Sequence, residues 1–191
     1  TPNQQVIARK LAALEHGEDA VVFGSGMAAI STLLLAYLAP GDHAVFQADL
    51  YGGTYHLVAK ELTRLGVQVT LCATAGEFPD AVRPNTRLLY VESPSNPLLN
   101  CIDLAAVAAL GRSQGLLTAI DNTFATPINQ NPLTFGFDAV VHSATKYLNG
   151  HSDLNAGVVI GASAVTRRVR EMALSLAACS MRTRARNWSA D

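Results

Sequence analysis

The sequence is poor in charge, in cysteine and in long apolar runs, and each shortage excludes a class of protein. Charged residues make up 15 % of the 191 residues and the net charge is −1, so neither nucleic acid nor an anionic membrane surface is favoured as a partner. The longest apolar run, near residues 28–39, is too short and too interrupted to span a bilayer. The three cysteines are scattered without metal-ligand spacing, which predicts reduced thiols, no metal site and a cytoplasmic location without a signal peptide.

Apolar residues are plentiful, and their pattern predicts one α/β domain. They make up 49 % of the chain, enough for a well-buried core and too many for a disordered protein. Short apolar strands are predicted at residues 19–23, 43–47, 67–71, 86–91, 116–120, 139–141 and 157–160. Helices are predicted near residues 6–14 and at 28–38, 51–65 and 103–114. This alternation predicts a mostly parallel sheet with helices on both faces.

The most informative segment is residues 137–161, where two apolar strands enclose a polar stretch. Ser143, Thr145 and Lys146 lie in that stretch. A partly desolvated lysine has a lowered pKa and can form a Schiff base with a carbonyl, and the two hydroxyls suit phosphate oxygens. A lysine beside a phosphate site suggests pyridoxal 5′-phosphate (PLP). Taken by itself, Lys146 is better explained as an exposed lysine in a turn, so the interpretation depends on the other cofactor contacts.

Other polar or glycine-rich turns follow the predicted strands. The turn around Gly26 and Met27 opens a helix, whose unpaired N–H groups favour an anion. Tyr51 could stack on a planar ring, Asn96 lies in a loop made rigid by two prolines, and Asp121 needs a cation or a donor. Each has a plainer alternative, namely an ordinary turn, a packed tyrosine, a crossover loop and a helix cap. Because ligands bind outside the carboxyl ends of parallel strands, we expect all of them on one rim with Lys146.

Together these residues resemble the Cys/Met-metabolism family of PLP enzymes. The family contains cystathionine γ-synthase, cystathionine γ- and β-lyases, homoserine-ester sulfhydrylases and methionine γ-lyase. The similarity covers residues 1 to about 175 and lies in SGMAAI (25–30), YGGTY (51–55), ESPSNPLL (92–99), DNTFATP (121–127) and HSATKYLNGHSDLNAGVV (142–159). The resemblance implies the large cofactor domain of an aspartate-aminotransferase-like, fold type I enzyme.

The resemblance also implies a role for each matching residue. Lys146 is implied as the Schiff-base lysine and proton carrier, and Asp121 as the partner of the pyridine nitrogen. Tyr51 is implied as the ring-stacking residue, with a part in proton transfer. The implied phosphate ligands are Gly26, Met27, Ser143 and Thr145. Asn96 is implied near the phenolic oxygen of the ring, and Glu92 is a further candidate.

The implied activity is PLP-dependent trans-sulfuration, by γ-elimination or γ-replacement on sulfur-containing amino acids or activated homoserine esters. The implied assembly is a homo-oligomer. Methionine γ-lyases carry a cysteine where this chain has Gly53, so YGGTY is more similar to the synthases, sulfhydrylases and cystathionine γ-lyases. One alternative is a truncated remnant that binds PLP weakly or not at all. Another, a nucleotide-binding α/β domain, leaves Lys146 unexplained.

The chain departs from the family at both ends. Residues 1–176 are expected to form the PLP-binding large domain, without the N-terminal arm that reaches the phosphate of a neighbouring subunit. The small C-terminal domain with the arginine for the substrate carboxylate is expected to be missing too. Residues 177–191 carry alternating arginines beside a tryptophan. We hypothesise that a frameshift near Leu176 makes them non-native, the alternatives being a solvated basic tail or a basic arm that binds a partner.

Overall fold

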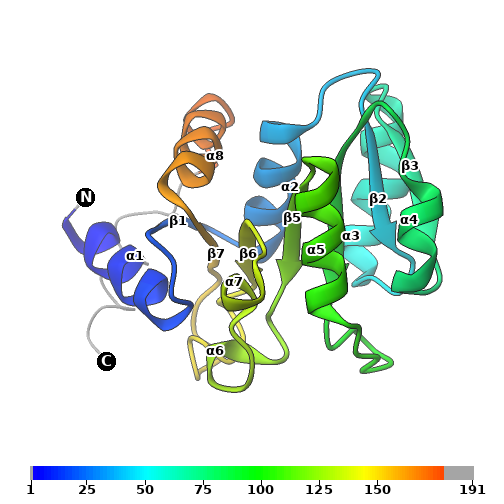
Figure 1. Ribbon diagram of the computed structural model, residues 1–191. Coiled ribbons are helices and arrows are strands. Elements are labelled where there is room, and N and C mark those ends of the chain that lie inside the picture. The colour runs from blue at the N-terminus through cyan, green and yellow to red at the C-terminus, as the bar shows by residue number, and fades with distance from the viewer. Residues whose placement is uncertain (1, 179–191) are drawn as a thin grey trace.

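Strands and helices alternate along the chain in a computed structural model that describes residues 2–178 (Figure 1). The strands are β1 (Asp19–Phe23), β2 (His43–Gln47), β3 (Gln68–Cys72), β4 (Thr86–Glu92), β5 (Leu117–Asp121), β6 (Ala139–His142) and β7 (Gly157–Gly161). The longer helices are α1 (Pro2–Leu14), α2 (Gly26–Tyr37), α5 (Leu104–Gln114) and α8 (Ser163–Ser175). The short ones are α3 (Gly52–His56), the π-helix η1 (Leu57–Leu62), the 3-10 helix η2 (Ala75–Glu77), α4 (Phe78–Ala81), α6 (Thr126–Asn129) and α7 (Pro132–Phe135). The frameshift hypothesis for residues 177–191 lies outside the described residues from 179 onward.

The strands form one seven-stranded sheet in the order β1-β7-β6-β5-β4-β2-β3. All neighbours from β6 to β3 are parallel, whereas β7 is antiparallel to both β1 and β6. The connection from β6 to β7 contains no crossover helix, which an antiparallel pair permits and a parallel pair does not. The predicted mostly parallel sheet is therefore confirmed, with β7 as the exception.

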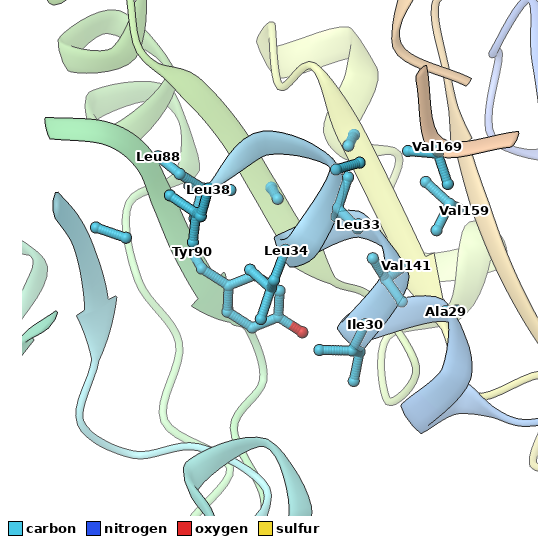
Figure 2. Close-up of a cluster of buried hydrophobic side chains, with 14 of the residues drawn as sticks. Ala29, Ile30, Leu33, Leu34, Leu38, Leu88, Tyr90, Val141, Val159 and Val169 are labelled. Carbon is cyan, nitrogen blue, oxygen red and sulfur yellow. The ribbon is translucent and has the colours of Figure 1, made fainter. Parts of the chain in front are cut away.

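Helices cover both faces of the sheet, as predicted. One face packs on α2, η1 and α8, and the other on α1, α4 and α5. Figure 2 shows Leu33 of α2 among strand side chains that include Tyr90 and Val141, and all three are completely buried. Successive strand residues such as Leu88 and Leu89 belong to the two opposite clusters, which explains why the strands are apolar throughout. This two-sided core fixes the strand ends that carry the polar turns.

Some element boundaries differ from the prediction in ways that matter. The strand predicted to stop at residue 120 includes Asp121, so this carboxyl is anchored by the sheet itself. The helix predicted at 51–65 begins at Gly52 and passes through the π-helical segment η1. The four-residue helices α4, α6 and α7 were not predicted, because each is shorter than one apolar repeat and has a proline in its first turn.

Candidate active site

A cleft of about 1020 Å³ opens at the carboxyl ends of the parallel strands. Its walls come from the start of α2, the turn before α3, the loop after β4, the end of β5 and the turn between β6 and β7. The eight site residues predicted from the sequence all lie on its lining: Gly26, Met27, Tyr51, Asn96, Asp121, Ser143, Thr145 and Lys146. The structure thus brings the predicted residues together on one rim, while their individual roles stay predictions.

One end of the cleft is suited to an anion. Ser25 caps α2 by accepting a hydrogen bond at its Oγ from the N–H of Ala28 at 3.1 Å. The helix begins at Gly26, and Gly26 and Met27 line the cleft at the end where a helix has N–H groups without intrahelical partners. A Cβ at Gly26 would lie 2.7 Å from the Cβ of Ser143. Glycine therefore lets the helix start approach the Ser143 hydroxyl closely, and amide and hydroxyl donors converge there.

The turn after β6 carries Lys146 and is fixed by hydrogen bonds at Ser143 and Thr145. The N–H of Lys146 donates to the carbonyl of Ser143 at 3.1 Å. The Thr145 hydroxyl donates to the carbonyl of Ala156 at 3.1 Å and accepts from its N–H at 3.0 Å. Thr145 thus fastens this turn to the segment before β7, an engagement that the sequence pattern did not predict. The Lys146 side chain is exposed.

Asp121 is held by the residue two positions after it. Its Oδ1 accepts hydrogen bonds from the N–H of Thr123 at 2.9 Å and from the Thr123 hydroxyl at 2.5 Å. The same hydroxyl accepts from the N–H of Ser143 at 2.8 Å. Burial raises the pKa of Asp121, while the bonds from Thr123 and the charge of His142 act in the opposite direction. A cation next to Asp121 would lower this pKa and stabilise the ionised carboxylate. The bridging role of Thr123 was missed, although a hydroxyl two residues after an aspartate is a known turn signal.

Glu92 lies beside Asp121 and is a second carboxyl on the lining of the cleft. The two residues are register partners at the ends of the parallel strands β4 and β5. Glu92 is 3 % exposed, and its Oε2 accepts a hydrogen bond from the N–H of Tyr51 at 2.8 Å. Burial, followed by the charge of Asp121, raises the pKa of Glu92 to about 8.

Tyr51 presents its ring to the cleft from the residue just before α3. Its side chain is 47 % exposed and lines the cleft. A Cβ at Gly53 would lie 2.7 Å from Cε1 of Tyr51 and 3.0 Å from Sδ of Met27. Glycine at position 53 therefore makes room for this ring orientation, which leaves the tyrosine able to stack on a planar ligand.

The loop after β4 positions Asn96 at the edge of the cleft. The neighbouring Ser95 is fully buried, and its hydroxyl donates to the carboxylate of Asp49. The side-chain amide of Asn100 also donates to Asp49, at 3.0 Å, and the N–H of Asn100 donates to the Ser95 hydroxyl at 3.1 Å. These bonds fix the loop, and the half-buried Asn96 lies on the cleft lining.

A buried polar network around Glu15 and His142 was missed by sequence reasoning. Glu15, just after α1, accepts at Oε1 from Nε2 of His142 at 2.6 Å and from the side-chain amide of Asn122 at 2.7 Å. Gln130 donates to Oδ1 of Asn122 at 2.8 Å. The only available signals were an acidic residue directly after an apolar helix and a histidine at the end of a buried strand. The network connects α1 to the strand ends next to Asp121.

Residues 2–178 give no evidence for a metal site or for a membrane-spanning helix. The described residues contain no group of histidine, cysteine, aspartate and glutamate side chains that could hold a metal ion. Their helices include none long and apolar enough to cross a bilayer. Cys72 is buried and Cys101 is exposed, and both are free thiols.

Comparisons with known proteins agree on one family. Residues 1–182 match the family described as Cys/Met metabolism PLP-dependent enzyme. Cystathionine β-lyase MetC of Staphylococcus haemolyticus is 48 % identical over 161 residues, which is 83 % of this chain and 41 % of that protein. Cystathionine γ-lyase of Bacillus subtilis is 46 % identical over 164 residues, 85 % of this chain and 43 % of the relative. The cystathionine γ-synthase of Mycobacterium tuberculosis is 45 % identical, with 83 % and 42 % covered.

The solved structures lead to the same conclusion. Cystathionine γ-lyase from Lactobacillus plantarum, complexed with L-serine, superimposes with a TM-score of 0.94 at 35 % identity, over 99 % of this chain and 50 % of that one. The chain thus spans about half the length of the relatives it matches, or slightly less. The family match extends over most of the sequence, and the chain belongs to the Cys/Met metabolism family of PLP-dependent enzymes.

Proposed function

We propose that this chain binds pyridoxal phosphate in the cleft and forms the cofactor-binding part of a trans-sulfuration enzyme. Its substrates would be sulfur-containing amino acids or activated homoserine esters. The observation that carries the proposal is the convergence of Lys146, Asp121 and Tyr51 with the start of α2 around one cleft, in a chain of this family.

The residues present fit a phosphate at one end of the cleft. The first amides of α2 and the Ser143 hydroxyl provide donors in a geometry that a Cβ at Gly26 would block. Thr145 fits less directly, because its hydroxyl donates to the carbonyl of Ala156. We therefore assign the amides of Gly26 and Met27 and the Ser143 hydroxyl as the phosphate ligands, with Thr145 joining them if it releases Ala156.

The other end fits a protonated aromatic ring. Asp121 is half-buried and desolvation raises its pKa, so a ring N–H⁺ would supply the cation that favours its ionised form. Tyr51 lies at the cleft with nearly half of its surface exposed and can cover one face of the ring. Asn96, on the fixed loop after β4, is assigned to a polar substituent of the ring.

The chemistry follows from where these residues hold protons. Pyridoxal phosphate, when bound, supplies a carbonyl carbon for an amine and a ring that withdraws electrons. Lys146 Nζ would hold the cofactor through this carbonyl carbon and would carry the α-proton of the substrate. The Asp121 carboxylate would hold the proton of the ring nitrogen. The Tyr51 hydroxyl would carry protons near the substrate. Both γ-replacement by a thiol and γ-elimination are compatible with these roles.

The partners and location belong to the same proposal. The cleft is large enough for a cofactor with a small amino acid beside it. We propose a homo-oligomer, which is what the family resemblance implies. We also propose a cytoplasmic location, which is supported by free thiols at Cys72 and Cys101.

The test is covalent labelling of Lys146. Pyridoxal phosphate is mixed with the chain, the product is reduced with borohydride, and the modified peptide is identified by mass spectrometry. We expect the label on Lys146, together with a visible absorbance band that is absent in Lys146→Ala and retained in Lys60→Ala, a change at another exposed lysine. A band retained in Lys146→Ala contradicts the assignment. Labelling without turnover of cystathionine or O-acetylhomoserine identifies the chain as a binding remnant. No band at all contradicts the proposed binding of pyridoxal phosphate, as expected for a non-binding remnant or for the nucleotide-binding alternative.

A further inference from the structure

The floor of the cleft carries two carboxyl groups side by side. Glu92 and Asp121 are register partners on β4 and β5, so both side chains leave the same edge of the sheet in the same direction. Both line the cleft. The proposed function gives Asp121 a cation but gives none to Glu92. Two adjacent carboxylates in a buried site cannot both ionise without a large cost.

The two oxygens of Glu92 have different surroundings. Oε2 accepts the N–H of Tyr51 at 2.8 Å. Oε1 is completely buried and has no hydrogen-bond partner among residues 2–178. An ionised carboxylate with one buried oxygen left unpaired is costly. A carboxylic acid removes the unpaired charge, because Oε2 still accepts from Tyr51 while Oε1 carries the proton. The buried Thr54 hydroxyl, which interacts with Glu92 and also has no hydrogen-bond partner among residues 2–178, is an acceptor available to that proton.

The charged groups around Glu92 act in the same direction. Asp121 approaches it from β5 and Asp49 from the segment after β2, and both disfavour a second negative charge. Tyr90 on its own strand is a neutral neighbour with a pKa raised by burial. Lys146, a cationic side chain of the cleft lining, is exposed and is not among the groups that shift the pKa of Glu92.

The balance of these effects supports a neutral acid. Burial is the largest cause that raises the pKa of Glu92 to about 8, and the charge of Asp121 adds to it. The N–H of Tyr51 and the Thr54 hydroxyl, both near the start of α3, act in the opposite direction without reversing the sign.

We propose that Glu92 is kept as the neutral acid at neutral pH, that it leaves Asp121 as the ionised carboxylate of the pair, and that its Oε2 positions Tyr51 at the cleft. Glu92 is thus a positioning residue, and the floor carries one negative charge for one cation. The protonation state is a property of the ligand-free chain. The consequence for a bound ring rests on the proposed function.

The first test measures the proton on Glu92 in the ligand-free chain. Glutamate is labelled with ¹³C at the carboxyl carbon, and infrared spectra are recorded from about pH 6 to about pH 10. We expect a protonated-carboxyl band at neutral pH that disappears with a midpoint of about 8. The band should be missing in Glu92→Gln and present in Glu171→Gln, a change at an exposed glutamate. It should titrate at lower pH in Asp121→Asn, because one of the two repelling charges is gone.

The opposite results overturn the proposal. No protonated band at neutral pH means that Glu92 is ionised, and a band that persists in Glu92→Gln belongs to another glutamate, such as the buried Glu15. If Glu92→Gln does not fold, the shift of the midpoint in Asp121→Asn still assigns the band. None of these readouts needs pyridoxal phosphate, so a failed labelling of Lys146 and a failed titration of Glu92 are separate outcomes.

The second test addresses the position of Tyr51. Hydrogen exchange at the Tyr51 N–H is measured by NMR and compared with exchange at Tyr90 in the core of β4. Glutamine keeps an acceptor oxygen, so we expect protection of Tyr51 in Glu92→Gln, but exchange about tenfold faster in Glu92→Ala, which loses one hydrogen bond. Equal protection in both variants removes the positioning role. Accelerated exchange at both the Tyr51 and the Tyr90 amide in Glu92→Ala reports general unfolding. In that case the wild type is compared with Glu92→Gln. Loss of protection at the Tyr51 amide in Glu92→Gln contradicts the positioning role, and retained protection supports it.

Discussion

Replacing Glu92 by glutamine should change how the stability of the ligand-free chain depends on pH. The ordinary pKa of a glutamate carboxyl is 4.5, and burial raises the pKa of Glu92 to about 8 in the folded chain. A raised pKa means that the folded state binds the proton more tightly than the unfolded state does. The associated stability is therefore fully present below about pH 4.5 and is lost as the pH rises through about 8. Glutamine cannot ionise, so the variant lacks this loss.

The size of the effect follows from the shift. At roughly 1.4 kcal/mol per pKa unit, a change from 4.5 to about 8 corresponds to an upper value on the order of 5 kcal/mol. Relaxation around the charge and water entering from the cleft reduce this value, so we expect a difference of roughly 2–4 kcal/mol to develop between acidic and alkaline conditions. Glu92→Gln should have similar or slightly lower stability at low pH and higher stability at high pH.

The assay is urea unfolding followed by circular dichroism at a series of pH values. The free energy of unfolding of Glu92→Gln is compared with that of the wild type, and Glu171→Gln serves as the exposed control. Asp121 titrates in both proteins, and because its charge interacts with Glu92, the difference reports the titration of the pair. Parallel pH profiles for wild type and Glu92→Gln would refute the reasoning, because they would mean that Glu92 has the same pKa in the folded and unfolded states.

Two further predictions concern the ring-binding wall and the buried network. Gly53→Ala adds a methyl group 2.7 Å from Cε1 of Tyr51, so we expect the ring to move and the affinity for pyridoxal phosphate to fall several-fold in an absorbance titration. Alanine favours the helical conformation over glycine by up to about 1 kcal/mol, so the variant should not unfold more easily. A variant with reduced stability and unchanged affinity for pyridoxal phosphate would contradict this account. Glu15→Ala removes the acceptor of His142 Nε2 and one of the two acceptors of the Asn122 side-chain amide, which still donates to the carbonyl of Gln130, and it should cost roughly 3–5 kcal/mol in urea unfolding. A loss below about 1 kcal/mol would show that the network adds little.

Much of the fold could be predicted because the apolar residues keep strict local patterns. Val140 and Val141 illustrate this, since a buried parallel strand needs apolar residues on both faces and leaves a short continuous apolar run. The rim was predictable for the same reason, since polar residues directly after such runs, as at Asp121, are placed by topology at one edge. The direction of β7 was not predicted, because a run such as residues 157–160 has the same composition in a parallel or an antiparallel neighbour.

The parts of the site that could not be predicted depend on contacts between distant segments. Glu15 and His142 are 127 positions apart, and neither carries a local pattern that identifies the other. Thr145 matches the expected phosphate hydroxyl in type and spacing, yet its bonds to Ala156 are set by how the turn folds back. The exposure of Lys146 also depends on the shape of the cleft mouth, about which its sequence neighbours carry no information.

The place of β1 in the sheet sets an order for folding during synthesis. β1 lies at the edge of the sheet and pairs with β7, Asp19 opposite Gly161. At ribosomal rates of about 5–20 residues per second, the nascent chain exposes the apolar residues Val21 and Val22 for on the order of ten seconds before their partner strand is made. An unpaired apolar strand is a template for aggregation. β1 therefore remains without its partner strand until the residues up to Gly161 have been synthesised.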